Sequence, residues 1–141
     1  MGAGCWAKQI VSHYKSASPR NKIVTVEPGL AASFKESLHM NALTGIQTGD
    51  TIMCGMNCGT TATIAWPVLR DGVYAAVAVT DRESHGCVME LQRMGIDAGP
   101  CGAANLAALR RLCEEGEIGD RSGMIVVLFS TEGNREYEVP H

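Results

Sequence analysis

Three short runs of aliphatic and β-branched residues constrain the fold of this chain more than any other feature. They are "KIVTVEP" at residues 22–28, "YAAVAV" at residues 74–79 and "GMIVVLFS" at residues 123–130. Runs that are this apolar, with little alternation of polar residues, are typical of strands buried on both faces of a parallel sheet. We therefore predict three strands, of which the last is the most hydrophobic.

Segments with a helical spacing of apolar residues separate these runs. The predicted helices cover residues 6–17, 30–38, 63–72, 81–95 and 101–116. We expect Asp81 to cap the fourth helix and Gly95 to end it. Its inward positions are predicted to be Val88, Leu91 and Met94. Strands that alternate with helices imply right-handed crossovers and an α/β fold, with three α/β/α layers around a parallel sheet.

The chain length fits one domain with its own core, so we treat residues 1–141 as a single unit. Within it, residues 41–61 are rich in Gly, Thr, Asn and Asp and show neither a helical nor a strand period. An irregular segment of this length in a compact domain is usually functional or wrongly assigned.

Charge and hydropathy exclude several classes of partner. The net charge is −3, and no basic stripe or block of like charge occurs, which argues against nucleic acid and anionic membranes. No apolar run approaches the ~20 residues of a membrane-spanning helix, and the N-terminus lacks the pattern of a signal peptide. We therefore expect a soluble protein of the cytoplasm.

The 6 cysteines are expected to be free thiols, because the sequence carries no secretory signal. Cys54 and Cys58 do not have the C-x-x-C spacing of a redox motif, and no His or Cys pair nearby completes a zinc site. The 4 histidines are scattered along the chain. We predict no metal site.

A glycine-rich turn at the start of the chain allows three interpretations. "GAGCWA" at residues 2–7 fits G-x-G-x-x-G/A, the dinucleotide fingerprint, and Glu27 stands about 20 residues further on, at the end of a predicted strand, where that fingerprint needs an acid. The same turn suits the phosphate of another ligand. It also suits a tight turn that needs glycine only for its φ angles. From these residues alone all three stay open.

Motifs along the whole chain favour the second interpretation. They are, in order, "GAGCWAKQIVSHYK", "IVTVEP", "DTIMCGMNCG", "IAWPVLRDGV", "GPCGAANLA" and "VVLFSTEGN". In this order they resemble the diaminopropionate ammonia-lyases, which belong to the tryptophan-synthase-β-like, fold-type-II enzymes that use pyridoxal 5'-phosphate (PLP). The most specific motif is "TIM-x-G-x-x-C-G" followed by "AWP-x-L". The likeness spans essentially all 141 residues.

The resemblance implies that PLP is the cofactor and that the glycine turn holds its phosphate. The implied phosphate-binding residues are Gly2, Ala3, Gly4, Cys5 and Trp6. Backbone N–H groups that no Cβ obstructs, at the positive end of a helix dipole, suit an anion. The family commonly has Ser where this chain has Cys5, so a hydroxyl donor is lost, and Glu27 becomes a strand-end residue of unassigned role.

The resemblance implies a second contact at the end of the last predicted strand. There Ser130 would hydrogen-bond the pyridine nitrogen of PLP, with Thr131 as the alternative if the alignment is shifted by one residue. A neutral partner leaves that nitrogen largely unprotonated, which restrains the ring as an electron sink and favours β-elimination or replacement. An ordinary polar strand end is the remaining alternative.

Two departures from the family pattern bear on activity. At residues 100–103 this chain has Pro-Cys-Gly-Ala, whereas the ammonia-lyases that it resembles have a motif similar to Glu-Ser-Gly-Ala. An acidic group of the family motif is therefore missing. The Schiff-base lysine of the family lies well upstream of the glycine turn. The lysines of this chain match no family motif: Lys8, Lys15, Lys22 and Lys35. We therefore expect residues 1–141 to be the C-terminal, cofactor-binding portion of a longer enzyme, without a catalytic residue of its own.

The complete enzyme is expected to take a small amino acid and to eliminate its β-amino group, giving pyruvate and ammonia after hydrolysis. The isolated chain is expected to be inactive, and to form a homodimer or pair with the missing N-terminal portion. Three alternatives remain. They are a fragment of a serine/threonine dehydratase, an NAD-binding half-domain of an oxidoreductase, and a non-enzymatic subunit that binds a partner through an open sheet edge.

Overall fold

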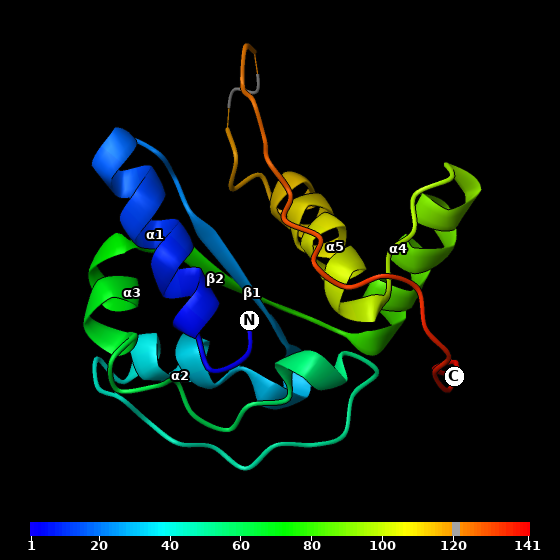
Figure 1. The fold of residues 1–141 in the computed structure, drawn as a ribbon, viewed down its shortest axis with the longest axis horizontal. Helices are drawn as coiled ribbons and strands as arrows, with labels where there is room; N and C mark the ends of the chain where they lie inside the picture. Colours follow the sequence, from blue (N-terminus) through cyan, green and yellow to red (C-terminus); the bar gives the residue numbers. More distant parts are fainter. Residues whose placement is uncertain (120–121) are drawn as a thin grey trace.

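The computed structural model describes residues 1–119 and 122–141. At its centre two parallel strands, β1 (Val24–Pro28) and β2 (Ala75–Val79), pair in register along their whole length. Helices that contact both strands lie on either side of this sheet (Figure 1). The predicted α/β class, with helix layers around a parallel sheet, is confirmed.

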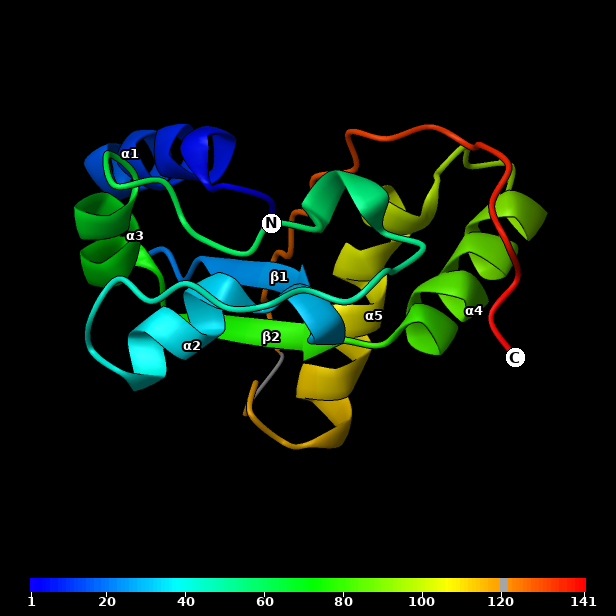
Figure 2. The ribbon, with the colours of Figure 1, turned by 90° about the horizontal axis from the view of Figure 1, so that it is seen from below.

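The helices predicted from apolar spacing are all present. They are α1 (Cys5–Ala17), α2 (Ser33–His39), α3 (Trp66–Gly72), α4 (Asp81–Arg93) and α5 (Pro100–Glu114). Two short 3-10 turns, η1 (Gly29–Ala31) and η2 (Cys54–Met56), lie in the connections. Helix α1 packs on α3, and α4 packs on α5, so these four helices form two pairs, while α2 contacts the two strands (Figures 1 and 2). None of the helices that the described residues form is long and apolar enough to cross a membrane.

The alternation of side chains along the strands divides the core in two. Val26, Val77 and Val79 point toward α4 and α5 and pack with buried residues of both helices. On the other face, a cluster around Phe34 and Leu69 joins α1, α2 and α3. Helix α5 contributes mainly small side chains to the first cluster: Ala103, Ala104, Ala107 and Ala108. Small residues allow the backbone of α5 to lie close to the sheet.

The N-cap of α4 is Thr80, not the predicted Asp81. Thr80 Oγ1 accepts the N–H of Glu83 at 3.2 Å, and Glu83 Oε2 accepts the N–H of Thr80 at 2.7 Å. This reciprocal capping box satisfies two backbone donors at once. Asp81 is the first helical residue, and its carboxylate accepts the N–H of Ile52 at 3.1 Å.

The other end of α4 agrees with the sequence only in part. Gly95 has a φ of 76° and follows the helix as predicted, and Val88 is fully buried. The prediction that Met94 faces the core is wrong, because its side chain is 65% exposed. Met94 is the C-cap residue, where the backbone leaves the helical path, so helical spacing no longer decides its direction.

The predicted third strand, at residues 123–130, is also wrong. These residues lie outside the sheet, and Ile125 and Val127 are 89% and 59% exposed. A strand needs a neighbouring strand for its N–H and C=O groups. In the part of the chain that the structure describes, the sheet contains only β1 and β2, which pair with each other. The segment runs beside α5 instead, where Asn105 Nδ2 donates to the Phe129 carbonyl (Figure 1).

Candidate functional site

The glycine turn requires glycine at position 4. Gly4 is the N-cap of α1 and has a φ of 89°, in the left-handed region that other residues rarely adopt. A Cβ on Gly4 would also lie 2.8 Å from Leu69 Cδ1. Behind the turn, the Ala3 carbonyl accepts the N–H of Ala62 at 2.8 Å. The turn is therefore fixed by both backbone conformation and packing.

The N-terminus of α1 presents free backbone donors. The first N–H groups of any helix, here those of Cys5, Trp6 and Ala7, have no acceptor inside the helix. No side chain caps this end, and its first turn carries no acidic residue. Nearby, the buried Thr61 hydroxyl has no hydrogen-bond partner among the described residues. With the dipole of a 13-residue helix behind them, these donors fit a phosphate group.

The irregular segment at residues 41–61 brings a second wall to this turn. Its 3-10 turn η2 places the Gly55 carbonyl 3.1 Å from where a Cβ of Gly2 would lie. On its other side, a Cβ on Gly55 would lie 3.3 Å from the Cys101 sulfur, in the first turn of α5. The segment therefore lies between the glycine turn and the start of α5.

Ser130 lies beside the start of α5, and not at a strand end as predicted. A Cβ on Gly102 would overlap the Ser130 hydroxyl, so this hydroxyl packs directly on the first turn of that helix. The adjacent Phe129 contacts Trp6 edge to face, with ring centroids 5.5 Å apart. Through this contact the structure brings the Ser130 segment to the glycine turn. Ser130 and Thr131 are both exposed.

Glu132 is a residue of this region that the sequence patterns did not reveal. Its Oε2 accepts the N–H of Cys101 at 2.6 Å, and its backbone carbonyl accepts the N–H of Gly99 at 3.0 Å. Its Oε1 accepts the Nε–H of Arg135 at 2.9 Å. The first turn of α5 contains no acidic residue, and the Glu132 carboxylate of the C-terminal segment lies against it instead. The one sequence signal was the Glu–Arg pair three residues apart.

Charges around the start of α5 set two ionisation states. Burial raises the pKa of Glu132, but hydrogen bonds from Arg135 and Cys101 outweigh it and leave the pKa below its usual value. Burial, and then the Glu132 carboxylate, raise the pKa of the Cys101 thiol to about 11. Glu132 is therefore ionised and Cys101 protonated at neutral pH.

Glu27, which the dinucleotide interpretation needs as a ribose ligand, binds backbone groups of α2 instead. It is fully buried, and its two carboxylate oxygens accept the N–H groups of Phe34 and Lys35, both at 2.9 Å. Burial raises its pKa, against the lowering effect of these two bonds. Glu27 therefore anchors the start of α2 and is not available to a ribose.

Two of the lysines are held away from the glycine turn by local contacts. Lys15, in the last turn of α1, donates to the carbonyls of Pro19 and Asn21, at 3.2 and 2.8 Å. Lys22 lies over the ring of Tyr74, 4.5 Å from its centre. Among the described residues no group of three or more His, Cys, Asp or Glu side chains could hold a metal ion, and the cysteines form no disulfide.

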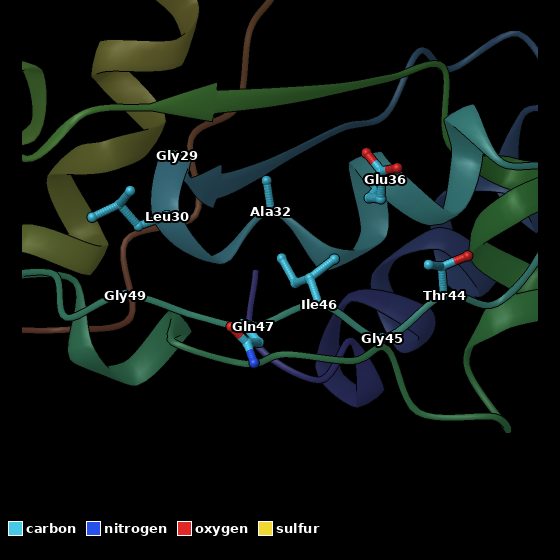
Figure 3. Close-up of a pocket in the computed structure, with 9 residues that line it drawn as sticks. All are labelled: Gly29, Leu30, Ala32, Glu36, Thr44, Gly45, Ile46, Gln47 and Gly49. Carbon is cyan, nitrogen blue, oxygen red and sulfur yellow. The ribbon is translucent and has the colours of Figure 1, made fainter.

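An open groove of about 500 Å³ lies on the other side of the irregular segment (Figure 3). It is lined by Gly29, Leu30, Ala32, Glu36, Thr44, Gly45, Ile46, Gln47 and Gly49. Ile46 points toward α2, whereas Gln47 points away from it (Figure 3). With one charged side chain in its lining, Glu36, the groove offers no group of residues for acid–base chemistry.

Comparison with known proteins gives both a family and a fold. Residues 1–131 match the family described as pyridoxal-phosphate dependent enzyme. The biosynthetic L-threonine dehydratase of Corynebacterium glutamicum is 26% identical over 139 residues, which cover 96% of this chain and 30% of that enzyme. The diaminopropionate ammonia-lyase of Salmonella typhimurium is 27% identical in an alignment of 156 residues, gaps included. This alignment covers 98% of this chain and 39% of that enzyme.

A solved structure supports the fold assignment. The crystal structure of a threonine deaminase from T.th. has a TM-score of 0.79 at 23% identity, covering 98% of this chain and 45% of that one. This chain therefore spans less than half the length of the relatives it matches. The cofactor of the matched family is PLP, as the motifs implied. Since the family match takes in nearly the whole chain, from the glycine turn to Thr131, this chain belongs to the pyridoxal-phosphate dependent enzyme family.

Proposed function

We propose that this chain forms the phosphate-binding portion of a PLP-dependent carbon–nitrogen lyase that acts on a small amino acid. The observation that carries the proposal is the uncapped N-terminus of α1 behind Gly4, in a chain matched to the family over residues 1–131. PLP, when bound, supplies an electron sink that acidifies the α-proton of an amino acid. The residues of this chain hold and orient it.

The proposed contacts come from three segments. The N–H groups of the residues at positions 2–6 bind the phosphate, and Cys5 contributes its backbone rather than a hydroxyl. Ser130, with Thr131 as the alternative, donates its hydroxyl hydrogen to the ring nitrogen. The η2 turn closes the phosphate site beside Gly2 and limits the access of water.

The preferred substrate is 2,3-diaminopropionate, which with one water yields pyruvate and two ammonia. The motif "TIM-x-G-x-x-C-G" and the likeness to an ammonia-lyase support this choice. The second candidate is serine or threonine, because the match to an L-threonine dehydratase is of similar strength. Either reaction needs a Schiff-base lysine from another portion of polypeptide, because the four lysines here match no family motif. We place the protein in the cytoplasm, because cysteines that form no disulfide among the described residues suit a reducing compartment.

Calorimetry with PLP, inorganic phosphate and NAD tests this proposal. We expect binding of PLP and phosphate, and a loss of at least about tenfold in affinity in Gly4→Ala, where a side chain strains the turn and meets Leu69. The matched control is Gly86→Ala, because nothing lies within 4 Å of a Cβ there. NAD binding that weakens in Glu27→Ala, without any binding of PLP, would overturn the proposal.

A catalytic assay tests the second part. The chain alone, with PLP added, is expected to release no pyruvate from 2,3-diaminopropionate or from serine, because none of its four lysines matches the family motif for the lysine that attacks the cofactor carbonyl. Protein-dependent turnover that survives substitution of all four lysines would contradict this expectation. Turnover that is lost on substitution of Lys8 alone would instead identify a catalytic lysine that the motifs do not reveal.

A further inference from the structure

A set of contacts joins the C-terminal segment at residues 130–137 to the start of α5 and the η2 turn, and η2 in turn contacts the glycine turn. In one direction Glu132 accepts the N–H of Cys101, and the sulfur of Cys101 packs against Gly55. The carbonyl of Gly55 in turn lies against Gly2. A carboxylate at one end of this path thus supports the glycine turn at the other.

A second path from the C-terminal segment to η2 runs through Arg135. Its Nε donates to Glu132 Oε1 at 2.9 Å, while its Nη2 donates to the carbonyl of Ile52. Ile52 lies two residues before η2, so one guanidinium ties the C-terminal segment to the segment that contacts the glycine turn. The side chains of Glu132 and Arg135 are 22% and 31% exposed, so this ion pair is shielded in part from water.

The start of α5 is shaped to receive the C-terminal segment. A Cβ on Gly99 would lie 2.6 Å from Glu132 Oε2 and would overlap the Gly133 carbonyl. A Cβ on Gly102 would lie 2.8 Å from the Glu132 carbonyl and overlap the Ser130 hydroxyl. Glycine at both positions therefore opens the space that the carboxylate and its backbone fill.

We propose that Glu132 is a positioning residue, which through Cys101 and Arg135 holds η2 against the glycine turn and so keeps the phosphate site in its binding geometry. This rests on the proposed function, in which the glycine turn binds phosphate. Glu132 touches neither the phosphate donors nor a reacting atom. It acts by fixing the two walls between which Gly2 lies.

Calorimetry with inorganic phosphate is the first test. Glu132→Ala removes the carboxylate, and we expect its phosphate affinity to fall by about tenfold, the scale of one hydrogen bond to a charged group. Glu132→Gln keeps an acceptor for the N–H of Cys101 and is expected to lose less than Glu132→Ala. Gly99→Ala displaces the carboxylate without removing it and should resemble Glu132→Ala. Asp71→Asn, which breaks an exposed ion pair on α3, is the control and should bind like the wild type.

Alkylation of Cys101 by iodoacetamide is the second test and needs no ligand. Removing the Glu132 carboxylate lowers the pKa of Cys101 and opens its surroundings, so alkylation should be at least about tenfold faster in Glu132→Ala. The control is Asp71→Asn, in which the alkylation rate of Cys101 should equal that of the wild type. All rates and affinities are measured at temperatures where circular dichroism shows every variant folded.

The outcomes separate the two proposals. If the wild type binds neither phosphate nor PLP, the proposed function fails, while the Cys101 rates still report whether Glu132 holds the start of α5. If the wild type binds phosphate, and Glu132→Ala and Gly99→Ala bind it equally well, Glu132 is not a positioning residue. Should Glu132→Ala fail to fold, Arg135→Gln gives the same decision, because it cuts the link from Glu132 to Ile52 and leaves the carboxylate in place.

Discussion

Several carboxylates in this protein accept backbone N–H groups, and two of them, Glu83 and Glu132, also pair with an arginine. Glu27, Glu83 and Glu132 each accept at least one backbone N–H, at 2.7–2.9 Å for the bonds to Glu27 and Glu83. The balance against burial differs between them, because burial raises the pKa of the fully enclosed Glu27, whereas the hydrogen bonds lower that of Glu83 and Glu132. Protonation at low pH therefore removes stabilisation that the ionised Glu83 and Glu132 give the fold, whereas protonation of Glu27 removes a buried charge.

Glu83→Gln is expected to weaken the acid sensitivity of the fold. Burial raises the pKa of Glu83, but hydrogen bonds from Thr80 and Arg111 outweigh it, so the folded pKa lies below the unfolded one. Such a group stabilises the fold above its unfolded pKa, and this contribution is lost as the pH falls through the folded pKa. Between about pH 6 and about pH 3 the wild type should lose more unfolding free energy than the variant in urea titrations.

The control for this measurement is Glu117→Gln, at an exposed position after α5. It should follow the wild type across the whole pH range. Equal acid losses in the wild type and in Glu83→Gln would show that the bonds from Thr80 and Arg111 contribute nothing to stability.

At the scale of elements, the strands and helices that depend on local pattern were predictable. β1 and β2 follow runs of β-branched and small apolar residues, and each helix follows apolar spacing. The strand predicted at residues 123–130 was not formed, because a strand also depends on a neighbour, which a local pattern does not report. The glycine turn was found from sequence for the same local reason. Glu132 was not, since its partners Gly99 and Cys101 lie about 30 residues away along the chain.

Thr80→Ala tests the element that depends most on a single side chain. Loss of the hydroxyl leaves the N–H of Glu83 without its capping acceptor, so the unfolding free energy should fall by about 1 kcal/mol. Thr80→Ser keeps the hydroxyl and should retain most of that stability. Urea midpoints of the three proteins give the comparison, and a Thr80→Ser variant as unstable as Thr80→Ala would show that the methyl group, not the cap, matters.

At the scale of the whole molecule, the described residues form two small cores on a two-stranded sheet, and five consecutive apolar residues of the C-terminal segment lie exposed outside them. These residues are Met124, Ile125, Val126, Val127 and Leu128. Contiguous exposed apolar residues usually mark a contact with another chain. Their strand-like sequence suits backbone pairing as well as side-chain burial.

We therefore expect the isolated chain to self-associate through residues 124–128. Val127→Lys places a charge in the middle of this surface and should shift sedimentation velocity profiles toward the monomer. Gln9→Lys adds the same charge at an exposed position on α1 and is the control. A wild-type chain that is monomeric at every accessible concentration would contradict the expectation.

The fit between Gly99 and Glu132 also constrains how this protein can evolve. A side chain at position 99 is excluded while the carboxylate is in place, because the two would occupy the same space. After Glu132 is lost, a side chain at position 99 still meets the Gly133 carbonyl but no longer meets a carboxylate. The double variant Gly99→Ala, Glu132→Ala should therefore be less damaged than the sum of its single variants, without reaching wild-type stability. A side chain at position 99 therefore requires residues 132–133 to move, so we expect the two sides of this contact to change together.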